Sequence, residues 1–374
     1  MKYWCGYLVA AVLAAISYGL MMLGAQFGTL VDMIYPYVMR TGQTMLAQWS
    51  SGVDFLLWQV LAIAGVLVIL ATLVLMIVLK WNPVQWLGWV LASVSLVFML
   101  NTLTYGLNHY AGPLADDIRL DVVEYNLDEL TEAAEFYRDR ANAYAEKVTR
   151  DEKGDVDFSD FATLAEKAGQ GFEALVHQRS FPVFAGSTLP VKELGWADWY
   201  TAKGITGVTV GITGEAAVNP QIPDVVLPFA MAHEMAHRMC IAGERDGNFA
   251  AYLACVHSDD NEFRYSAFFM AYKLCYEALA SMEGQQAAAA AARVQKGTNE
   301  KLYQDMVAYD NFFGPLSSGT GDHSVCDLLV SWHIQEVVIP SITVVEKEFD
   351  PMDESQVDLS GIVNAKPQEE EAVG

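Results

Sequence analysis

The segment AHEMAHR at residues 232–238 carries two histidines four residues apart, with a glutamate directly after the first. Residues at this spacing project from one face of a helix, with Cβ atoms about 6 Å apart. His233 and His237 can therefore bind one zinc ion at about 2.0–2.1 Å. Glu234 then lies beside the open coordination position, where a carboxylate can take the proton from a metal-bound water. The chain has only 7 histidines in 374 residues, and shuffling this composition would produce the pattern on the order of once in a hundred sequences.

A catalytic zinc usually has three protein ligands and one water, so a third ligand is expected downstream of His237. The carboxylate and imidazole candidates are Glu244, Asp246, His257, Glu262 and Glu277. Spacing alone does not choose among them, because thermolysin-like enzymes place the third glutamate on a following helix. His257 falls at the C-terminal end of its predicted helix, where its charge can interact with the helix dipole.

Three long apolar runs occupy the first part of the chain, at residues 4–27, 55–79 and 86–107. Each has at least the roughly 20 residues that a bilayer requires, and none contains an acidic or basic residue. Helices of soluble proteins normally carry a polar stripe. The runs therefore predict three transmembrane helices. Their lack of ionisable residues argues against a transporter that moves its substrate through these spans.

Charge is distributed unevenly along the chain. The formal net charge is −24, but residues 1–110 carry only three basic and two acidic side chains. The negative excess lies downstream, where it repels phosphate groups and argues against a nucleic-acid partner. This change in composition predicts a transmembrane region over residues 1–110, a domain over residues 111–345 and an acidic, disordered tail over residues 346–374.

Basic residues next to the predicted spans indicate their orientation. Lys2 precedes the first span and Lys80 lies in the short turn between the second and third, and such residues favour the cytoplasmic side. The protein is therefore expected to be a multi-pass protein of the cell membrane with its downstream domain outside the cytoplasm. Arg40, in the loop predicted over residues 28–54, favours the opposite orientation. The first span is longer than a signal-peptide core and lacks a good cleavage site, so it is expected to be retained.

The downstream region is predicted to be mainly helical, with helices over residues 119–148, 155–175, 285–293, 299–313 and 327–342. Residues 204–214 combine glycines with β-branched side chains, which predicts a strand or a hairpin. An exposed strand edge there could bind an extended substrate peptide, with Gly207 and Val208 as the binding residues. The alternative is an ordinary hairpin that packs against the zinc-binding helix.

Four cysteines lie in the predicted external domain: Cys240, Cys255, Cys275 and Cys326. They could form two disulfides, in three connectivities. The first three fall in apolar helical runs, where a buried free thiol is equally suited. None of the four has the CxxC spacing of a structural zinc site.

Several short motifs together resemble the DUF3810 family of bacterial membrane proteins. They are Pro228-Phe229 before the two histidines, ERDGNF at residues 244–249, RYS at 264–266, GITG at 204–207 and TGEA at 213–216. The likeness covers most of residues 1–340, including the three spans. The ERDGNF block is also similar to the Glu-x-x-Ala-Asn/Asp signature of other HExxH peptidases, whose first glutamate is the third zinc ligand. The resemblance therefore implies Glu244 as the third ligand.

The chain departs from the family pattern close to these motifs. Asp246 and Gly247 replace a glutamate and an alanine, and Cys240 stands where a glycine is usual. Asp246 stays a secondary candidate for the site. Asn248 is a candidate to hydrogen-bond a ligand histidine, or else an ordinary cap or surface asparagine. Tyr265 could stabilise a tetrahedral oxyanion, although a core tyrosine is the simpler interpretation.

We therefore expect a mainly α-helical membrane protein, with three N-terminal transmembrane helices followed by a zincin-like, gluzincin-type α+β metallopeptidase domain that has a small hairpin or sheet. One Zn²⁺ per chain would be bound by His233, His237 and Glu244. Glu234 would be the general base when zinc-activated water hydrolyses a peptide bond, as in a zinc metalloendopeptidase. The expected partners are a peptide or protein substrate and the lipid bilayer. A catalytically inactive zinc-binding scaffold for partner recognition is the alternative, but a purely structural site would not need Glu234.

Overall fold

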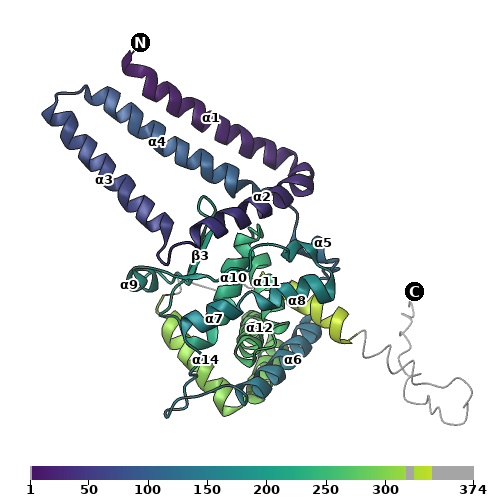
Figure 1. Cartoon of the computed structure of the whole chain (residues 1–374). Helices are drawn as coiled ribbons and strands as arrows, with labels where there is room; N and C mark the ends of the chain where they lie inside the picture. The colour runs from purple at the N-terminus through teal and green to yellow at the C-terminus, as the bar shows by residue number, and fades with distance from the viewer. Residues whose placement is uncertain (1, 317–323, 339–374) are drawn as a thin grey trace, which may run out of the picture. The chain divides into compact units, whose positions relative to one another are not determined.

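The computed structural model describes residues 2–316 and 324–338, which are mainly helical with one small sheet (Figure 1). The chain divides into two compact units, Met1–Ser331 and Trp332–Gly374. The first unit contains the three apolar runs and the residues of the predicted metal site. In the second unit, the described residues are the end of helix α15 (Cys326–His333) and the π-helical turn Ile334–Val338. The predicted acidic tail lies outside the described residues.

Among the described residues, three helices are long and apolar enough to cross a membrane: α1 (Cys5–Gln26), α3 (Leu57–Val78) and α4 (Pro83–Thr104). The three apolar helices expected from the sequence are thus confirmed. Helices α1 and α4 approach closely, because a Cβ on Gly6 would lie 2.4 Å from the backbone of Gly88. Small residues permit such close helix packing in membranes.

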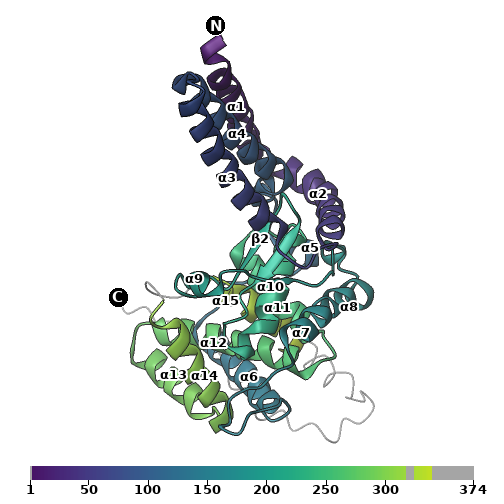
Figure 2. The same ribbon diagram turned by 60° about the vertical axis from the view of Figure 1, so that its left-hand side comes forward.

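Residues 28–54, which we expected to be a loop, instead form helix α2 (Gly28–Ser50) over most of their length. Its polar residues gather on one face, where Arg40, Gln43 and Ser50 are buried. The opposite face is exposed and mostly apolar, with Thr41 and Gln48 among its apolar side chains. The helix lies where α1 ends and α3 begins, whereas the N-terminus of α1 and the α3–α4 turn lie at the far end of these helices (Figures 1 and 2).

The remaining helices of the first unit are short to medium in length. They are α5 (Leu114–Ile118), α6 (Leu127–Ala145), α7 (Phe161–Lys167), α8 (Gln170–Arg179), α9 (Ala197–Thr201), α10 (Leu227–Arg238), α11 (Glu244–Val256), α12 (Asn261–Ser281), α13 (Gln285–Lys296) and α14 (Glu300–Phe313). The helix predicted over residues 119–148 begins only at Leu127, because Asn126 and Glu129 form a capping box. The helix predicted over residues 155–175 is divided into α7 and α8, and Asp160 caps the first of them.

A three-stranded sheet lies beside α10, with the strand order β1-β3-β2. Its strands are β1 (Lys192–Glu193), β2 (Gly207–Val210) and β3 (Glu215–Val218). Strands β2 and β3 are antiparallel, which confirms the hairpin expected near residues 204–214. Strand β2 is an edge strand, and Val208 packs against a buried cluster that contains Leu56 and Ala217.

The sheet is joined directly to the start of α3 through Glu215, which is only 2% exposed. Its carboxylate accepts hydrogen bonds from the backbone N–H groups of Leu57 and Trp58 at 2.8 and 2.9 Å. These groups have no partner within the helix, and a negative charge at a helix N-terminus is favourable. Lys192 of β1 forms an ion pair with the same carboxylate at 2.8 Å. The apolar helices and the downstream domain therefore share a buried polar junction.

Candidate metal centre

Helix α10 carries the two predicted histidine ligands on one face. It begins with Pro228 in its first turn, where a missing N–H costs nothing. It ends before Cys240, whose φ of +72° places it in the left-handed conformation that closes many helices. A glycine would adopt this conformation with less strain than a residue with a Cβ. The rings of His233 and His237 lie with their centroids 4.5 Å apart and almost perpendicular to each other.

Glu244, the first residue of α11, faces both histidines. One carboxylate oxygen lies 3.2 Å from His233 Nε2 and the other lies 3.5 Å from His237 Nε2. Four ligand atoms arranged tetrahedrally around zinc at about 2.05 Å would be about 3.3 Å apart. The two histidines and Glu244 therefore fit the spacing of a zinc site, and all three ligand atoms lie within 4.8 Å of one another.

The tautomer of His237 is set by the backbone. Its Nδ1 lies 2.8 Å from the carbonyl oxygen of Ile241, and a carbonyl can only accept, so Nδ1 carries the proton. In the neutral ring, Nε2 is then free to bind a metal. Gly247 packs over both rings, because a Cβ there would lie 3.1 Å from His233 Cε1 and 3.2 Å from His237 Cε1. The glycine at this position therefore leaves room for the two imidazoles.

The electrostatics of the cluster suit a cation. Hydrogen bonds with His233 and His237 hold the pKa of Glu244 well below its usual range. Burial lowers the pKa of His237, but Glu244, Glu234 and the carbonyl of Ile241 together raise it above its usual value. The glutamates do so because a carboxylate attracts an imidazolium. A metal cation bound between these groups would replace that positive charge.

Glu234 is only 5% exposed and lies beside β2. The hydroxyl of Thr209 lies 2.7 Å from Glu234 Oε2 and 2.9 Å from the backbone carbonyl oxygen of Glu234, and the carboxylate is the nearer acceptor. Gly207 also packs against this side chain and leaves no room for a Cβ, which would lie 2.5 Å from Glu234 Oε1. Burial raises the pKa of Glu234, and His233, His237 and Thr209 offset part of that shift. The carboxylate is therefore confined next to the two histidines by the edge strand.

A cavity of about 400 Å³ opens over the cluster. It is lined by residues 204–209 of the hairpin, by Ala242, and by Tyr105 and His109, in addition to the three candidate ligands and Glu234. Tyr105 follows the last residue of α4 directly. Thr209, Tyr105 and His109 were not assigned to the site from the sequence. They lie far from the histidines along the chain, and no motif connects them.

The other four candidates for the third ligand have different partners. The carboxylate of Asp246 accepts from the N–H of Leu114 at 3.0 Å. Glu262 accepts from Ser159 N–H at 2.8 Å, and Glu277 forms an ion pair with Lys273. His257 Nδ1 lies 2.8 Å from the carbonyl oxygen of Leu253. Of the five, only Glu244 belongs to the cluster with His233 and His237.

Tyr265 and Asn248 do not make the contacts at the candidate metal site that the sequence allowed. Tyr265 is fully buried and donates a hydrogen bond to Asp305, which also forms a 2.6 Å ion pair with Arg150. It is therefore a core tyrosine, and its hydroxyl has a partner away from the cavity. Asn248 is half-buried on α11 and does not bond His237, whose Nδ1 faces the carbonyl of Ile241. His233 Nδ1 is buried without a hydrogen-bond partner among the described residues.

The four cysteines of this region, which could have formed two disulfides, are free and buried: Cys240, Cys255, Cys275 and Cys326. Burial raises the pKa of Cys240 to about 11. These thiols therefore pack as small apolar side chains.

A family model described as "Protein of unknown function (DUF3810)" matches residues 31–324. The matched residues include α3, α4, the hairpin and the three residues of the candidate metal cluster. Neither a curated protein nor a solved structure matches the chain. Because the match spans most of the sequence, the chain belongs to the DUF3810 family.

Proposed function

We propose that this protein is a zinc-dependent metallopeptidase anchored in the cell membrane, with a zincin-like domain that hydrolyses peptide bonds. The observation that carries this proposal is the convergence of His233, His237 and Glu244 at ligand-like distances beside a buried fourth side chain, Glu234. A site that only stabilised the fold would need three or four ligands, but it would not need that additional carboxylate beside an open cavity.

Each side chain has a distinct role in this proposal. His233, His237 and Glu244 hold the zinc, which polarises the substrate carbonyl and lowers the pKa of water. Glu234 accepts the proton of the attacking water and later donates it to the leaving amine. Thr209 fixes the orientation of the Glu234 carboxylate through its hydroxyl. The cavity beside these groups supplies the space for the substrate.

The free edge of β2 supports binding of an extended peptide. The N–H of Asn219 donates to the carbonyl of Thr206, and hydrogen-bonded pairs alternate along an antiparallel ladder. Val208 therefore belongs to a hydrogen-bonded pair with Ala217, whereas the backbone groups of Gly207 and Thr209 point away from β3. We assign these two residues, rather than Val208, to the substrate edge, because the Val208 side chain also packs into the core cluster.

The orientation in the membrane follows from the flanking lysines. Lys80 lies in the α3–α4 turn, at the end of these helices far from α2 (Figures 1 and 2). Lys2 directly precedes α1, and the N-terminus of α1 lies at the same end of the three helices as this turn. Basic residues favour the cytoplasm, so the metal centre is proposed to lie outside the cytoplasm, in a multi-pass protein.

The proposal is tested on the purified full-length chain in detergent. Zinc content is measured by mass spectrometry, and an unbiased peptide library is digested with and without a zinc chelator. We expect about one zinc per chain and cleavage that the chelator abolishes and added zinc restores. Bound zinc without any cleavage would instead support the inactive scaffold. Cleavage that persists after complete removal of zinc would contradict the proposal.

A further inference from the structure

Helix α2 has the character of a helix that lies in a membrane interface. Its exposed side contains a stripe of apolar residues, each between 51% and 68% exposed: Leu30, Met33, Ile34, Val38, Met45 and Trp49. Its opposite side is buried against the protein. Its two ends are joined to candidate membrane spans by short segments, because α1 ends at Gln26 and α3 begins at Leu57. A helix with these features is typical of a segment that lies in the headgroup region.

A second exposed aromatic group is found near the start of α3. Trp196 and Trp199, at the start of α9, are 57% and 56% exposed. They are held near that membrane end because Gln59 of α3 donates to the carbonyl of Gly195 at 3.2 Å. Tryptophan is enriched where apolar spans enter the headgroup layer. Helices α2 and α9 therefore both lie at the height of the headgroup layer, where the spans leave the bilayer. We call this height the membrane surface level.

One side chain of α2 binds the hairpin beside the metal cavity to the end of α4 at the membrane surface level. Gln43 of α2 is fully buried, and its amide donates to the carbonyl of Thr104, at the end of α4, at 2.8 Å. The same amide donates to the carbonyl of Gly211, in the β2–β3 turn, at 2.9 Å. A Cβ on Gly211 would lie 2.4 Å from the Cβ of Tyr105. The tip of the hairpin therefore contacts the end of a span.

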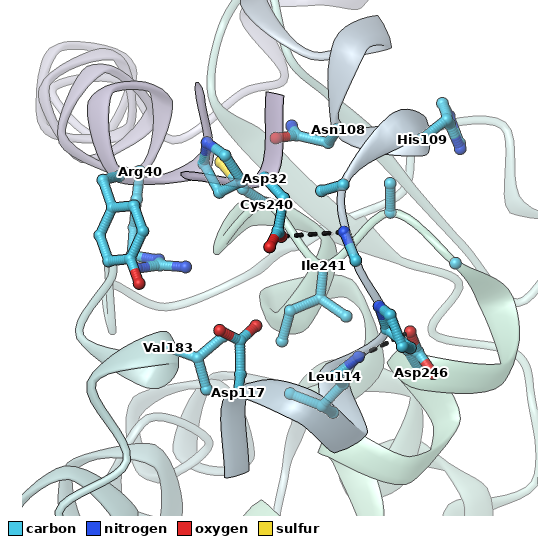
Figure 3. A pocket seen from close by; sticks show the side chains of 17 residues that line it. Asp32, Arg40, Asn108, His109, Leu114, Asp117, Val183, Cys240, Ile241 and Asp246 are labelled. Carbon is cyan, nitrogen blue, oxygen red and sulfur yellow. Dashed lines mark hydrogen bonds between the residues drawn. The ribbon is translucent and has the colours of Figure 1, made fainter. Parts of the chain in front are cut away.

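The helix with the two histidines is fixed to α2 as well. Arg40 of α2 donates to the carbonyl of Met239, just after α10, at 3.2 Å. Figure 3 shows the cavity at this joint, with a volume of about 330 Å³, where Asp32 and Asp246 hold the segment between α4 and α5 from opposite sides. Asp32 accepts from Gly112 N–H and Asp246 accepts from Leu114 N–H.

The distance along β2 from the membrane surface level to Glu234 is short. Gly207 and Thr209, which contact Glu234, lie two to four residues from Gly211 at the tip. At about 3.3 Å per strand residue this separation is roughly 7–13 Å. A chain that leaves the bilayer beside α4 thus reaches Glu234 within about ten residues, even after it crosses part of the headgroup layer.

From this arrangement we propose that the substrates are membrane-anchored polypeptides, cut in the extended segment that directly follows their membrane span. The proposal rests on the proposed peptidase function and adds the substrate class. The segment leaves the bilayer close to the hairpin tip, and the edge of β2 guides it to Glu234. A soluble polypeptide lacks the anchor that would hold its segment at this height.

The test uses the zinc-loaded full-length protein in phosphatidylcholine vesicles and three probes with the same randomised segment. The first probe carries an apolar anchor helix of about 20 residues. The second has no anchor. The third has the anchor and a polyproline spacer of about 12 residues, which holds the segment roughly 37 Å farther from the bilayer while the surface density stays equal. Mass spectrometry locates every cut.

We expect cuts in the first probe to cluster within about ten residues of the anchor, and the second and third probes to be cut at least about tenfold more slowly. A second readout does not depend on turnover. In the Glu234→Gln variant, a photoreactive group placed along the segment should cross-link to residues 207–211 only from positions near the anchor.

Equal cleavage of all three probes, with cuts unrelated to the anchor, would overturn the substrate class and leave the peptidase function intact. Failure of the zinc-loaded protein to cut or cross-link any probe would overturn both.

Discussion

Thr209 is the residue that holds the Glu234 carboxylate, through a hydroxyl 2.7 Å from Oε2. Thr209→Val keeps the shape of the side chain and removes this donor. Loss of an outer hydrogen-bond partner typically costs about 10–100-fold in activity, so we expect hydrolysis to fall by that factor while zinc content is unchanged. Thr209→Ser restores the hydroxyl and should retain most of the activity. Equal rates for the valine and serine variants would show that the hydroxyl does not orient Glu234.

Glu244 is the third ligand in this account, and its removal should release the metal. Glu244→Ala should weaken zinc binding by more than the roughly 10–100-fold that loss of an outer partner causes, as measured by competition with a chelating dye. Glu262→Ala and Glu277→Ala are matched controls, because their carboxylates contact Ser159 and Lys273 instead. Zinc loss in either control, with zinc retained by Glu244→Ala, would reassign the site.

The residues that sequence reasoning could find were those joined by helical spacing or by a local block. His233, Glu234 and His237 lie within one turn and a half of α10, and Glu244 follows after a short break. Thr209 is 25 residues from Glu234, and Tyr105 is farther still. Their contacts depend on how a hairpin and the end of a span pack against α10, which no local pattern encodes.

At the scale of elements, the N-terminus of α3 depends on a carboxylate from β3. Glu215 pairs with Lys192 and caps the first N–H groups of α3. Glu215→Ala removes the charged partner of the Lys192 ammonium and leaves it only the carbonyl oxygens of Ser50 and Phe55, and breaking a buried pair costs about 3–5 kcal/mol. We therefore expect a large drop in the thermal unfolding midpoint in detergent.

Glu193→Ala, at an exposed position on neighbouring β1, is the control and should change stability by less than about 0.5 kcal/mol. If the two variants unfolded at the same temperature, Glu215 would not stabilise this junction.

The helices and strands that the sequence predicted correctly have a residue pattern that is continuous over a short stretch of the chain. Helices α1, α3 and α4 are continuous apolar runs, and glycines among β-branched residues marked the hairpin. Helix α2 escaped prediction because its apolar residues form a stripe rather than a run, and Pro36 lies within it. The boundary between α7 and α8 was also missed. It falls at Gly169, where a Cβ would lie 2.7 Å from Thr188, a contact that only the folded chain contains.

At the scale of the whole molecule, the orientation in the membrane decides where the metal centre acts. In a Cys5→Ser background, Glu283→Cys lies in the exposed turn between α12 and α13, and Trp81→Cys lies in the exposed turn between α3 and α4. The four remaining native thiols are buried. We expect an impermeant maleimide to label the first reporter in intact cells but not the second, because Lys80 favours the cytoplasm. The reverse pattern would place the site in the cytoplasm.

The apolar helices and the metal centre form part of one compact unit, Met1–Ser331. Gln43, Arg40 and Glu215 connect the two regions through buried hydrogen bonds. Removal of the first 110 residues would leave several of these partners unsatisfied, and an unpaired buried polar group costs about 1–3 kcal/mol. Metal binding and catalysis are therefore best measured on the full-length chain.

The most direct test of the central claim compares the wild-type chain with Glu234→Gln, purified at full length and loaded with zinc. Glutamine keeps the size of the side chain but cannot accept the proton. Both proteins should contain about one zinc per chain, and hydrolysis by the variant should fall by about 10²–10⁴-fold. Absence of zinc from the wild-type protein, or undiminished hydrolysis by the variant, would contradict the assignment of this site as a zinc peptidase centre.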